Sequence, residues 1–228
     1  MSHEPVPQRS PGPAHVLLLG GQKSGKSGHA EQLAAAWLAE QPGREVLVIA
    51  TAQALDDEMR TRIARHRQQR RQRLPAAQTL EEPLQLAASI AAHSAPQRLL
   101  LVDCLTLWLT NWLMPAEPAA PTPAQGATQG GLLDAPPDEA ALLRQRRAAL
   151  AAAKAALLQA LAQARGPVVL VSNEMGWGVM PLGRAVRAYA DELGLLNQAL
   201  AQHCRHVLLV AAGQAIDIKA LAQPLPRL

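Results

Sequence analysis

Aromatic residues are almost absent from this chain of 228 residues. It contains four Trp, one Tyr and no Phe, although 49% of its residues are hydrophobic. Proteins that bind single-stranded nucleic acid without sequence preference stack bases on aromatic rings. The composition therefore argues against a nucleic-acid partner. The core must be built from Leu, Ala and Val, and the chain is long enough for one sizeable core.

Cysteine and long apolar runs are also scarce. Cys104 and Cys204 stand alone in apolar surroundings and match neither a zinc-binding spacing nor a disulfide framework. No apolar run is long enough to cross a bilayer, so we expect no stable membrane insertion. Residues 1–14 hold four prolines and no apolar core of a signal peptide, which predicts a disordered tail. Together these features favour a cytoplasmic protein.

A glycine-rich segment, GGQKSGKS at residues 20–27, directly follows the apolar run VLLL. Gly20 and Gly25 bracket four residues before Lys26 and Ser27, which is the spacing of a P-loop. Successive backbone N–H groups of such a loop face phosphate oxygens, Lys26 reaches the outer phosphates, and Ser27 holds Mg²⁺. The following helix adds its positive N-terminal dipole. The segment predicts a nucleoside triphosphate as ligand.

Short apolar runs alternate with longer segments of helical periodicity. This pattern predicts an α/β fold with a doubly wound, mostly parallel sheet and flanking helices, as in RecA-like P-loop NTPases. We expect one domain over residues 15–228, with a flexible excursion rich in Pro, Ala and Gly over about 115–137. The predicted strands are 16–19, 46–50, 99–102, 168–171 and 207–211. The predicted helices are 26–40, 54–71, 82–93, 105–113, 138–164 and 182–204.

Polar residues follow two of the predicted strands, at the sheet edge where nucleotides bind in such folds. Asp103 ends one strand and is a candidate to hold Mg²⁺ or to position water. It could equally cap the helix that starts near Leu105. Asn173 and Glu174 follow another strand. Glu174 is a candidate base or second metal contact, and an ordinary loop carboxylate is the alternative.

Seven arginines lie between residues 60 and 73, although the formal net charge of the chain is only +4. On a helix, Arg62, His66 and Arg70 share one face. Neighbouring positive charge favours the neutral, nucleophilic form of a histidine ring, which could attack an α-phosphate while the arginines neutralise the triphosphate. By itself the pattern fits a histidine on a solvated helix face at least as well.

Taken together, five segments resemble the bifunctional adenosylcobinamide kinase / adenosylcobinamide-phosphate guanylyltransferase family of cobalamin biosynthesis. The resemblance runs in order from about Val16 to Lys219, and the second and fourth segments are its most specific parts. The segments are GGQKSGKS, ATAQALDDEMRTRIARHRQQR, VDCLTLWLTN, VLVSNEMGWGVMP and AGQAIDIK.

The resemblance implies two reactions. The hydroxyl of adenosylcobinamide is phosphorylated with ATP or GTP, and GMP is then transferred from GTP to that phosphate, with release of pyrophosphate, through a guanylylated histidine. By motif position this histidine is His66, with Lys26 and Glu174 as further catalytic candidates. The resemblance also implies a corrinoid substrate, Mg²⁺ held by Ser27 and Asp103, and a homo-oligomer, possibly a trimer. The implied nucleotide contacts are Gly20, Gly21, Gln22, Lys23, Ser24, Gly25, Lys26, Ser27, Ala50, Thr51, Ala52, Arg67, Gln68, Gln69, Arg70, Glu81 and Asp103.

Three departures from the family pattern stand out. The Trp that usually precedes the acidic residue after the arginine cluster is missing, which leaves Glu82 as an alternative to Glu81. The Arg usually found two residues before Asn197 is also missing, and the 115–137 excursion is longer than the family predicts. Two other functions compete: a P-loop small-molecule kinase with no covalent nucleotide, and a regulatory protein that binds polyanions through its arginines.

Overall fold

A computed structural model describes residues 12–114, 139–178 and 183–222. The predicted excursion over 115–137 and most of the predicted N-terminal tail lie outside these residues. Within the described part no helix has both the length and the apolar composition needed to cross a membrane.

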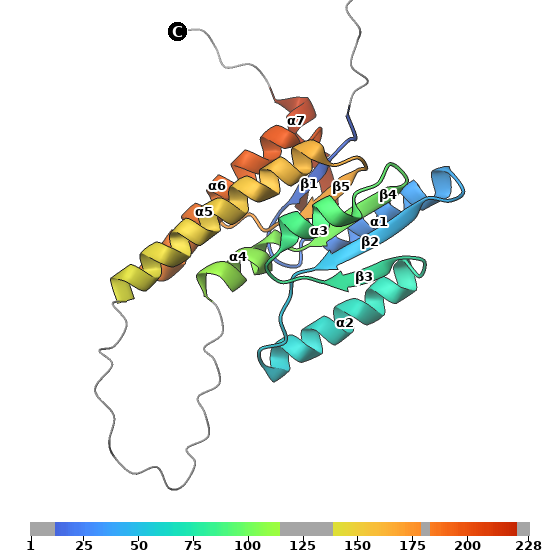
Figure 1. The fold of residues 1–228 in the computed structure, drawn as a ribbon. Coiled ribbons are helices and arrows are strands. Elements are labelled where there is room, and N and C mark those ends of the chain that lie inside the picture. Colours follow the sequence, from blue (N-terminus) through green and yellow to red (C-terminus); the bar gives the residue numbers. More distant parts are fainter. Residues whose placement is uncertain (1–11, 115–138, 179–182, 223–228) are drawn as a thin grey trace, which may run out of the picture.

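One seven-stranded sheet forms the centre of the fold, in the order β3-β2-β4-β5-β1-β6-β7 (Figure 1). Neighbouring strands are parallel except for β7, which runs antiparallel to β6. The strands are β1 (Val16–Leu19), β2 (Glu45–Ala50), β3 (Gln78–Glu81), β4 (Arg98–Asp103), β5 (Val168–Val171), β6 (His206–Ala211) and β7 (Gln214–Asp217). The predicted mostly parallel sheet is confirmed, with all five predicted strands in it.

Two strands were not predicted, β3 and β7, and both are edge strands. Their sequences are QTLE and QAID, and most of their residues are exposed or only half buried. An edge strand needs no continuous apolar run because one side of it faces solvent. Apolar periodicity therefore could not reveal either strand.

The helices cover both faces of the sheet, as a doubly wound fold requires (Figure 1). One apolar cluster joins the sheet to α1, and the other joins it to α3, α4, α5 and α6. The helices are α1 (Lys26–Glu40), α2 (Asp57–Arg73), α3 (Leu86–His93), α4 (Leu105–Leu113), α5 (Glu139–Gln163), α6 (Arg184–His203) and the short, unpredicted α7 (Ile218–Leu221).

Alternation along the strands separates these two clusters. Leu17 belongs to the cluster under α3 to α6, whereas its neighbour Leu18 belongs to the cluster under α1. On β4, Leu100 and Leu101 divide in the same way. Successive side chains of a strand point to opposite faces, so a strand buried on both sides is apolar throughout. This is why the central strands were easy to find in the sequence.

The prediction that α3 begins at Glu82 was wrong, because the helix begins at Leu86. The Glu82 carboxylate accepts hydrogen bonds from the backbone N–H groups of Leu84 (2.9 Å) and Gln85 (2.7 Å). Pro83, between Glu82 and Leu84, has no N–H group to donate. The segment 82–85 therefore forms a turn that precedes the helix.

Candidate active site

The glycine-rich segment forms a tight loop between β1 and α1. The Lys26 ammonium group turns back into this loop and donates to the carbonyl oxygens of Gly20 (2.9 Å) and Gly21 (2.7 Å). Lys26 is buried, and burial lowers its pKa, although the nearby Cys104 and Asp103 act in the opposite direction. A buried cation held by carbonyl oxygens is placed to meet phosphate oxygens at the mouth of the loop.

Two glycines of the loop are required by its close packing against β6 and the turn that follows it. A Cβ atom on Gly20 would lie 2.2 Å from the Val210 carbonyl oxygen, and one on Gly25 would lie 3.3 Å from Cα of Gly213. Both also have positive φ angles, 153° and 109°. The Gly213 N–H donates to the Ser24 carbonyl oxygen at 2.9 Å. The phosphate loop is thus supported by the C-terminal strand pair.

A cleft of about 720 Å³ opens in front of this loop, between it and α2. Thirteen of the predicted site residues line it. They are Gln22, Lys23, Ser24, Gly25, Lys26, Ser27, Ala50, Ala52, His66, Arg67, Arg70, Glu81 and Asp103. The cleft therefore brings together the phosphate loop, the end of β2, the arginine-rich helix and the carboxyl end of β4.

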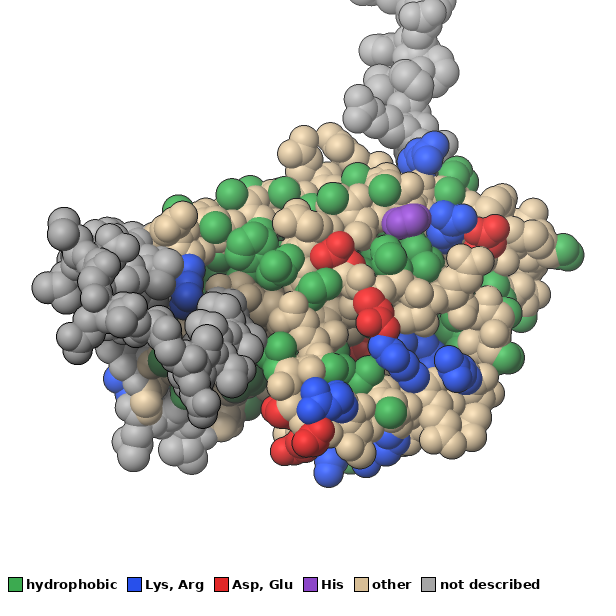
Figure 2. Space-filling model, turned by 60° about the horizontal axis from the view of Figure 1, so that its bottom comes forward, with side chains coloured by type: hydrophobic (Ala, Val, Ile, Leu, Met, Phe, Trp, Pro, Cys, Tyr) green, Lys and Arg blue, Asp and Glu red, His purple; other side chains and the backbone are tan. Residues whose placement is uncertain are grey.

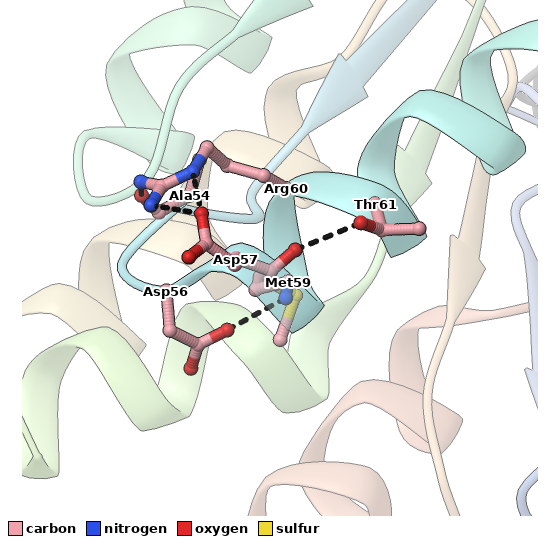
Figure 3. Close-up of polar contacts among 6 residues, drawn as sticks. All are labelled: Ala54, Asp56, Asp57, Met59, Arg60 and Thr61. Atoms are coloured by element: carbon pink, nitrogen blue, oxygen red, sulfur yellow. Dashed lines mark hydrogen bonds and ion pairs between the residues drawn. The ribbon is translucent and has the colours of Figure 1, made fainter.

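The start of α2 is fixed by its acidic residues (Figure 3). The Asp56 carboxylate accepts a hydrogen bond from the Met59 N–H at 2.6 Å, which makes Asp56 the N-cap. Asp57 pairs with Arg60 at 2.6 Å, and its carbonyl oxygen accepts from the Thr61 hydroxyl. Acidic groups in the first turn also suit the helix dipole. The DDEM segment thus sets where the helix begins.

Helix α2 is held to the rest of the fold by arginines of its last two turns. Arg70 donates to the Asp103 carboxylate at 2.7 Å, Arg73 pairs with Glu31 of α1 at 3.2 Å, and Arg67 pairs with Glu81 of β3. Figure 2 shows basic and acidic side chains next to one another at several places on this side of the molecule. Arg70 is the one buried residue of α2, and no apolar side chain of this helix is fully buried. Charge pairs therefore contribute much of the attachment of α2.

His66 lies on the side of α2 that faces the cleft. It is half buried and lines the cleft together with Arg62 and Arg70, one helical turn before and after it. The predicted shared face of these three residues is therefore present. Its ring makes no hydrogen bond in the described part of the chain, so both ring nitrogens are available to a ligand.

Asp103 and Ser27 offer oxygen ligands of the kind that Mg²⁺ prefers. Both line the cleft, but in this structure the Asp103 carboxylate is engaged by Arg70. No group of three His, Cys, Asp or Glu residues gathers as a metal site within the described ranges. Mg²⁺ needs only one or two protein oxygens beside phosphates and water, so these two residues fit that role.

Cys104 also lines the cleft, directly after Asp103. Burial, with a smaller effect from Asp103, raises the pKa of its thiol to about 11. The thiolate is the nucleophilic form of cysteine, so this side chain is inert at neutral pH.

Six other predicted residues lie outside the cleft lining: Gly20, Gly21, Thr51, Gln68, Gln69 and Glu174. Thr51 is fully buried, and its hydroxyl donates to the Cys104 carbonyl oxygen at 2.7 Å. Gln68 and Gln69 are exposed on α2. The Glu174 carboxylate accepts from the Gly176 N–H at 2.9 Å within its own loop.

Asn173 lines the cleft, although sequence reasoning gave the catalytic role to its neighbour Glu174. The signal that separates them is strand alternation: Val171 and Asn173 point to the face that carries the cleft, and Ser172 and Glu174 point away. The alternation was present in the sequence, but its use required knowing which face of the sheet carries α1 and α2.

A P-loop at the end of a central parallel strand, a buried lysine and an acidic residue on a nearby strand define a nucleotide-binding protein of the P-loop NTPase class. Sequence comparison gives the particular family. Residues 16–218 match the family described as cobinamide kinase / cobinamide phosphate guanyltransferase, and the chain belongs to it.

Individual relatives agree with this assignment. The chain is 44% identical over 204 residues to the bifunctional adenosylcobalamin biosynthesis protein CobP of Pseudomonas aeruginosa, covering 89% of this chain and 96% of the relative. It is 36% identical to the proteins named CobU of Escherichia coli and Salmonella typhimurium, covering 90% of this chain and 99% of each relative. The match therefore extends over nearly the whole of each protein.

Proposed function

We propose that the chain phosphorylates adenosylcobinamide with ATP or GTP and then transfers GMP from GTP to the resulting phosphate through a guanylylated His66. Family membership supports the kinase and guanylyltransferase activities. One observation carries the covalent step: His66 faces the phosphate loop across the cleft, between Arg62 and Arg70.

The proposed transfer has two displacements. A ring nitrogen of His66 attacks the α-phosphorus of GTP, and the bond from that phosphorus to the α–β bridging oxygen breaks, so pyrophosphate leaves. A phosphate oxygen of the corrinoid substrate then attacks the same phosphorus. The phosphorus–nitrogen bond breaks, which restores the imidazole and gives adenosylcobinamide-GDP.

The remaining cleft residues support these steps through charge. The phosphate loop and Lys26 hold the β- and γ-phosphates, and arginines of α2 neutralise the departing pyrophosphate. Ser27 and Asp103 would hold Mg²⁺, which supplies charge neutralisation for the phosphates when bound. Arg70 must release Asp103 for this, and its guanidinium group is then free to meet phosphate oxygens. We also propose self-association, with trimers as the resemblance suggests.

Labelling with GTP that carries a radioactive α-phosphate tests the covalent step. The protein should acquire a label that is stable in alkali and lost in acid, as expected of a phosphorus–nitrogen bond. His66→Ala should remove the label while leaving phosphorylation of adenosylcobinamide measurable, because that reaction uses the γ-phosphate.

His93→Ala is the matched control, because His93 ends α3 and does not line the cleft. It should label like the unchanged protein. A label that persists in His66→Ala would disprove the role of His66, and the absence of any label in the active, unchanged protein would favour a kinase without a covalent intermediate.

A further inference from the structure

We infer that the side-chain amide of Asn173 contacts the phosphoryl group and the acceptor hydroxyl during the phosphorylation step. This inference rests on the kinase activity of the proposed function and is independent of His66. The sequence suggested Glu174 as the residue after β5 that takes part in the reaction. The inference gives a part in the reaction to Asn173 instead.

Sheet order puts Asn173 between the two parts of the site that hold phosphates and metal. Strand β5 lies between β4, which ends at Asp103, and β1, which leads into the phosphate loop. Val171 is level with Asp103 on one side and with Leu18 on the other. Asn173, two residues further along, therefore extends beyond Asp103 beside the start of the loop.

Alternation then decides which side chain faces the ligand. The ladder between β5 and β1 continues past the strand end, since the Ser172 N–H donates to Leu18 (2.9 Å) and the Glu174 N–H donates to Gly20 (3.0 Å). The backbone at Asn173 is thus still extended. Its side chain points to the same face as that of Val171, and both line the cleft. Glu174 points away and bonds its own loop.

The backbone of Asn173 is fixed on both sides. Its N–H donates to the Thr106 hydroxyl at 2.9 Å, where β4 has ended and offers no carbonyl oxygen. Its carbonyl oxygen accepts from the side-chain amide of Asn197 on α6 at 3.0 Å. Thr106 and Asn197 are both buried. Rigid support of this kind is what a group that contacts reacting atoms requires.

The side-chain amide of Asn173, by contrast, has no hydrogen-bond partner among the described residues, although it borders the cleft. An amide offers two donors and one acceptor oxygen without carrying charge. Its NH₂ group can donate to an oxygen of the transferred phosphoryl group while its oxygen accepts from the attacking hydroxyl. A carboxylate at this point would repel the phosphates instead.

In the step itself, the acceptor hydroxyl oxygen forms a bond to the γ-phosphorus as the bond to the β–γ bridging oxygen breaks. The nucleoside diphosphate leaves with that electron pair, and the hydroxyl proton passes to an oxygen of the transferred phosphoryl group. Asn173 neither gains nor loses a proton, and it stabilises the charge that spreads over the phosphoryl oxygens.

The test compares both half-reactions in Asn173→Ala. We expect kcat for phosphorylation of adenosylcobinamide to fall about 10- to 100-fold, with KM for ATP changed less than about 3-fold, because one polar contact to the transition state is lost. Transfer of GMP to supplied adenosylcobinamide phosphate should stay within about 3-fold of the unchanged protein, since that reaction occurs at the α-phosphorus.

Unchanged phosphorylation in Asn173→Ala, or an equal loss in both half-reactions, would overturn the inference. A larger loss of phosphorylation in Glu174→Gln would do the same by restoring the rival residue. If the unchanged protein phosphorylates no adenosylcobinamide, the proposed function fails instead, so the two failures are distinct.

Thr106→Val tests the support of the Asn173 backbone separately from the proposed contact of the Asn173 side chain with the substrate. It also provides a test if Asn173→Ala folds poorly. It removes the hydroxyl that accepts from Asn173 and conserves volume. We expect kcat for phosphorylation to fall less than in Asn173→Ala, with KM for ATP unchanged. In the double variant with Asn173→Ala, Thr106→Val should add little to the loss. A full, independent loss in the double variant would contradict the proposed support role.

Discussion

Lys26 donates hydrogen bonds to its own loop. Its removal should therefore affect the conformation of the loop as well as the charge of the site. Its ammonium group bridges the Gly20 and Gly21 carbonyl oxygens, so Lys26→Ala takes away a brace of the loop as well as the proposed phosphate contact. We expect phosphorylation and guanylylation each to fall by about 100-fold or more, the size of loss seen for preorganised charge stabilisation.

The same preparation of Lys26→Ala should be assayed for both reactions, with thermal unfolding as a check that it folds. A parallel loss indicates that one nucleotide site serves both reactions. Retention of guanylylation alongside lost kinase activity would instead require separate sites.

Single residues show where sequence reasoning succeeded and where it stopped. The glycine-rich loop between β1 and α1 was predictable because its conformation depends on the local spacing of its glycines. The sequence did not show which of Asn173 and Glu174 lines the cleft, because this depends on which face of the sheet carries α1 and α2. The Arg70–Asp103 pair joins residues from two separate elements, and no local pattern in either of them predicts the contact.

At the scale of elements, α2 is a part of the site with little apolar support, since Arg70 is its one buried residue. Its pair between Arg70 and Asp103 is nearly enclosed, with side chains 8% and 16% exposed. Partly buried charge pairs couple more strongly than exposed ones, and removal of one partner leaves the other unpaired.

A double-mutant cycle of Arg70→Met and Asp103→Asn should therefore give a coupling free energy of about 1–3 kcal/mol in urea unfolding. The matched control is Arg60→Met with Asp57→Asn within α2, whose side chains are 56% and 96% exposed. That cycle should give less than about 0.5 kcal/mol. Equal couplings in the two cycles would show that the Arg70–Asp103 pair does not anchor α2.

Elements also differ in how far the sequence revealed them. The central strands and α1 and α4 were predicted with correct or nearly correct limits because burial on both faces gives a continuous apolar run or a clear helical period. The edge strands β3 and β7 carry polar residues and were missed. The start of α3 was misplaced because a glutamate that caps a turn resembles the first residue of a helix.

At the scale of the whole molecule, His15 connects α5, β5 and the residue before β6 through hydrogen bonds. One ring nitrogen bonds the Leu161 carbonyl oxygen of α5 at 3.0 Å, and the other accepts from the Val168 N–H of β5 at 3.1 Å. Its own carbonyl oxygen accepts from the Arg205 N–H, just before β6. A ring that accepts at one nitrogen and donates at the other is neutral.

Burial lowers the pKa of His15 from its ordinary value of 6.5, with a small further decrease from His203, while the bond to Leu161 acts in the opposite direction. Below pH 6.5 the unfolded chain binds a proton that the folded protein does not, so the free energy of unfolding should decrease as pH falls towards the folded-state pKa. Above pH 7 this contribution should be constant.

Urea unfolding between pH 5 and pH 8 measures this effect. His15→Asn keeps a polar acceptor but cannot titrate, so its free energy of unfolding should decrease less over the acidic part of that range. An identical pH dependence in both proteins would show that another group is responsible.

The turn between β6 and β7 presses Gly213 against the phosphate loop, and the consequence concerns the order in which the protein is made. Synthesis delivers the loop well before the β6–β7 turn whose backbone supports it. A growing chain therefore carries the phosphate-binding signature long before it has the support that shapes it. Nucleotide binding can therefore report on completion of the fold, because the loop gains this support only when β6 and β7 have folded against it.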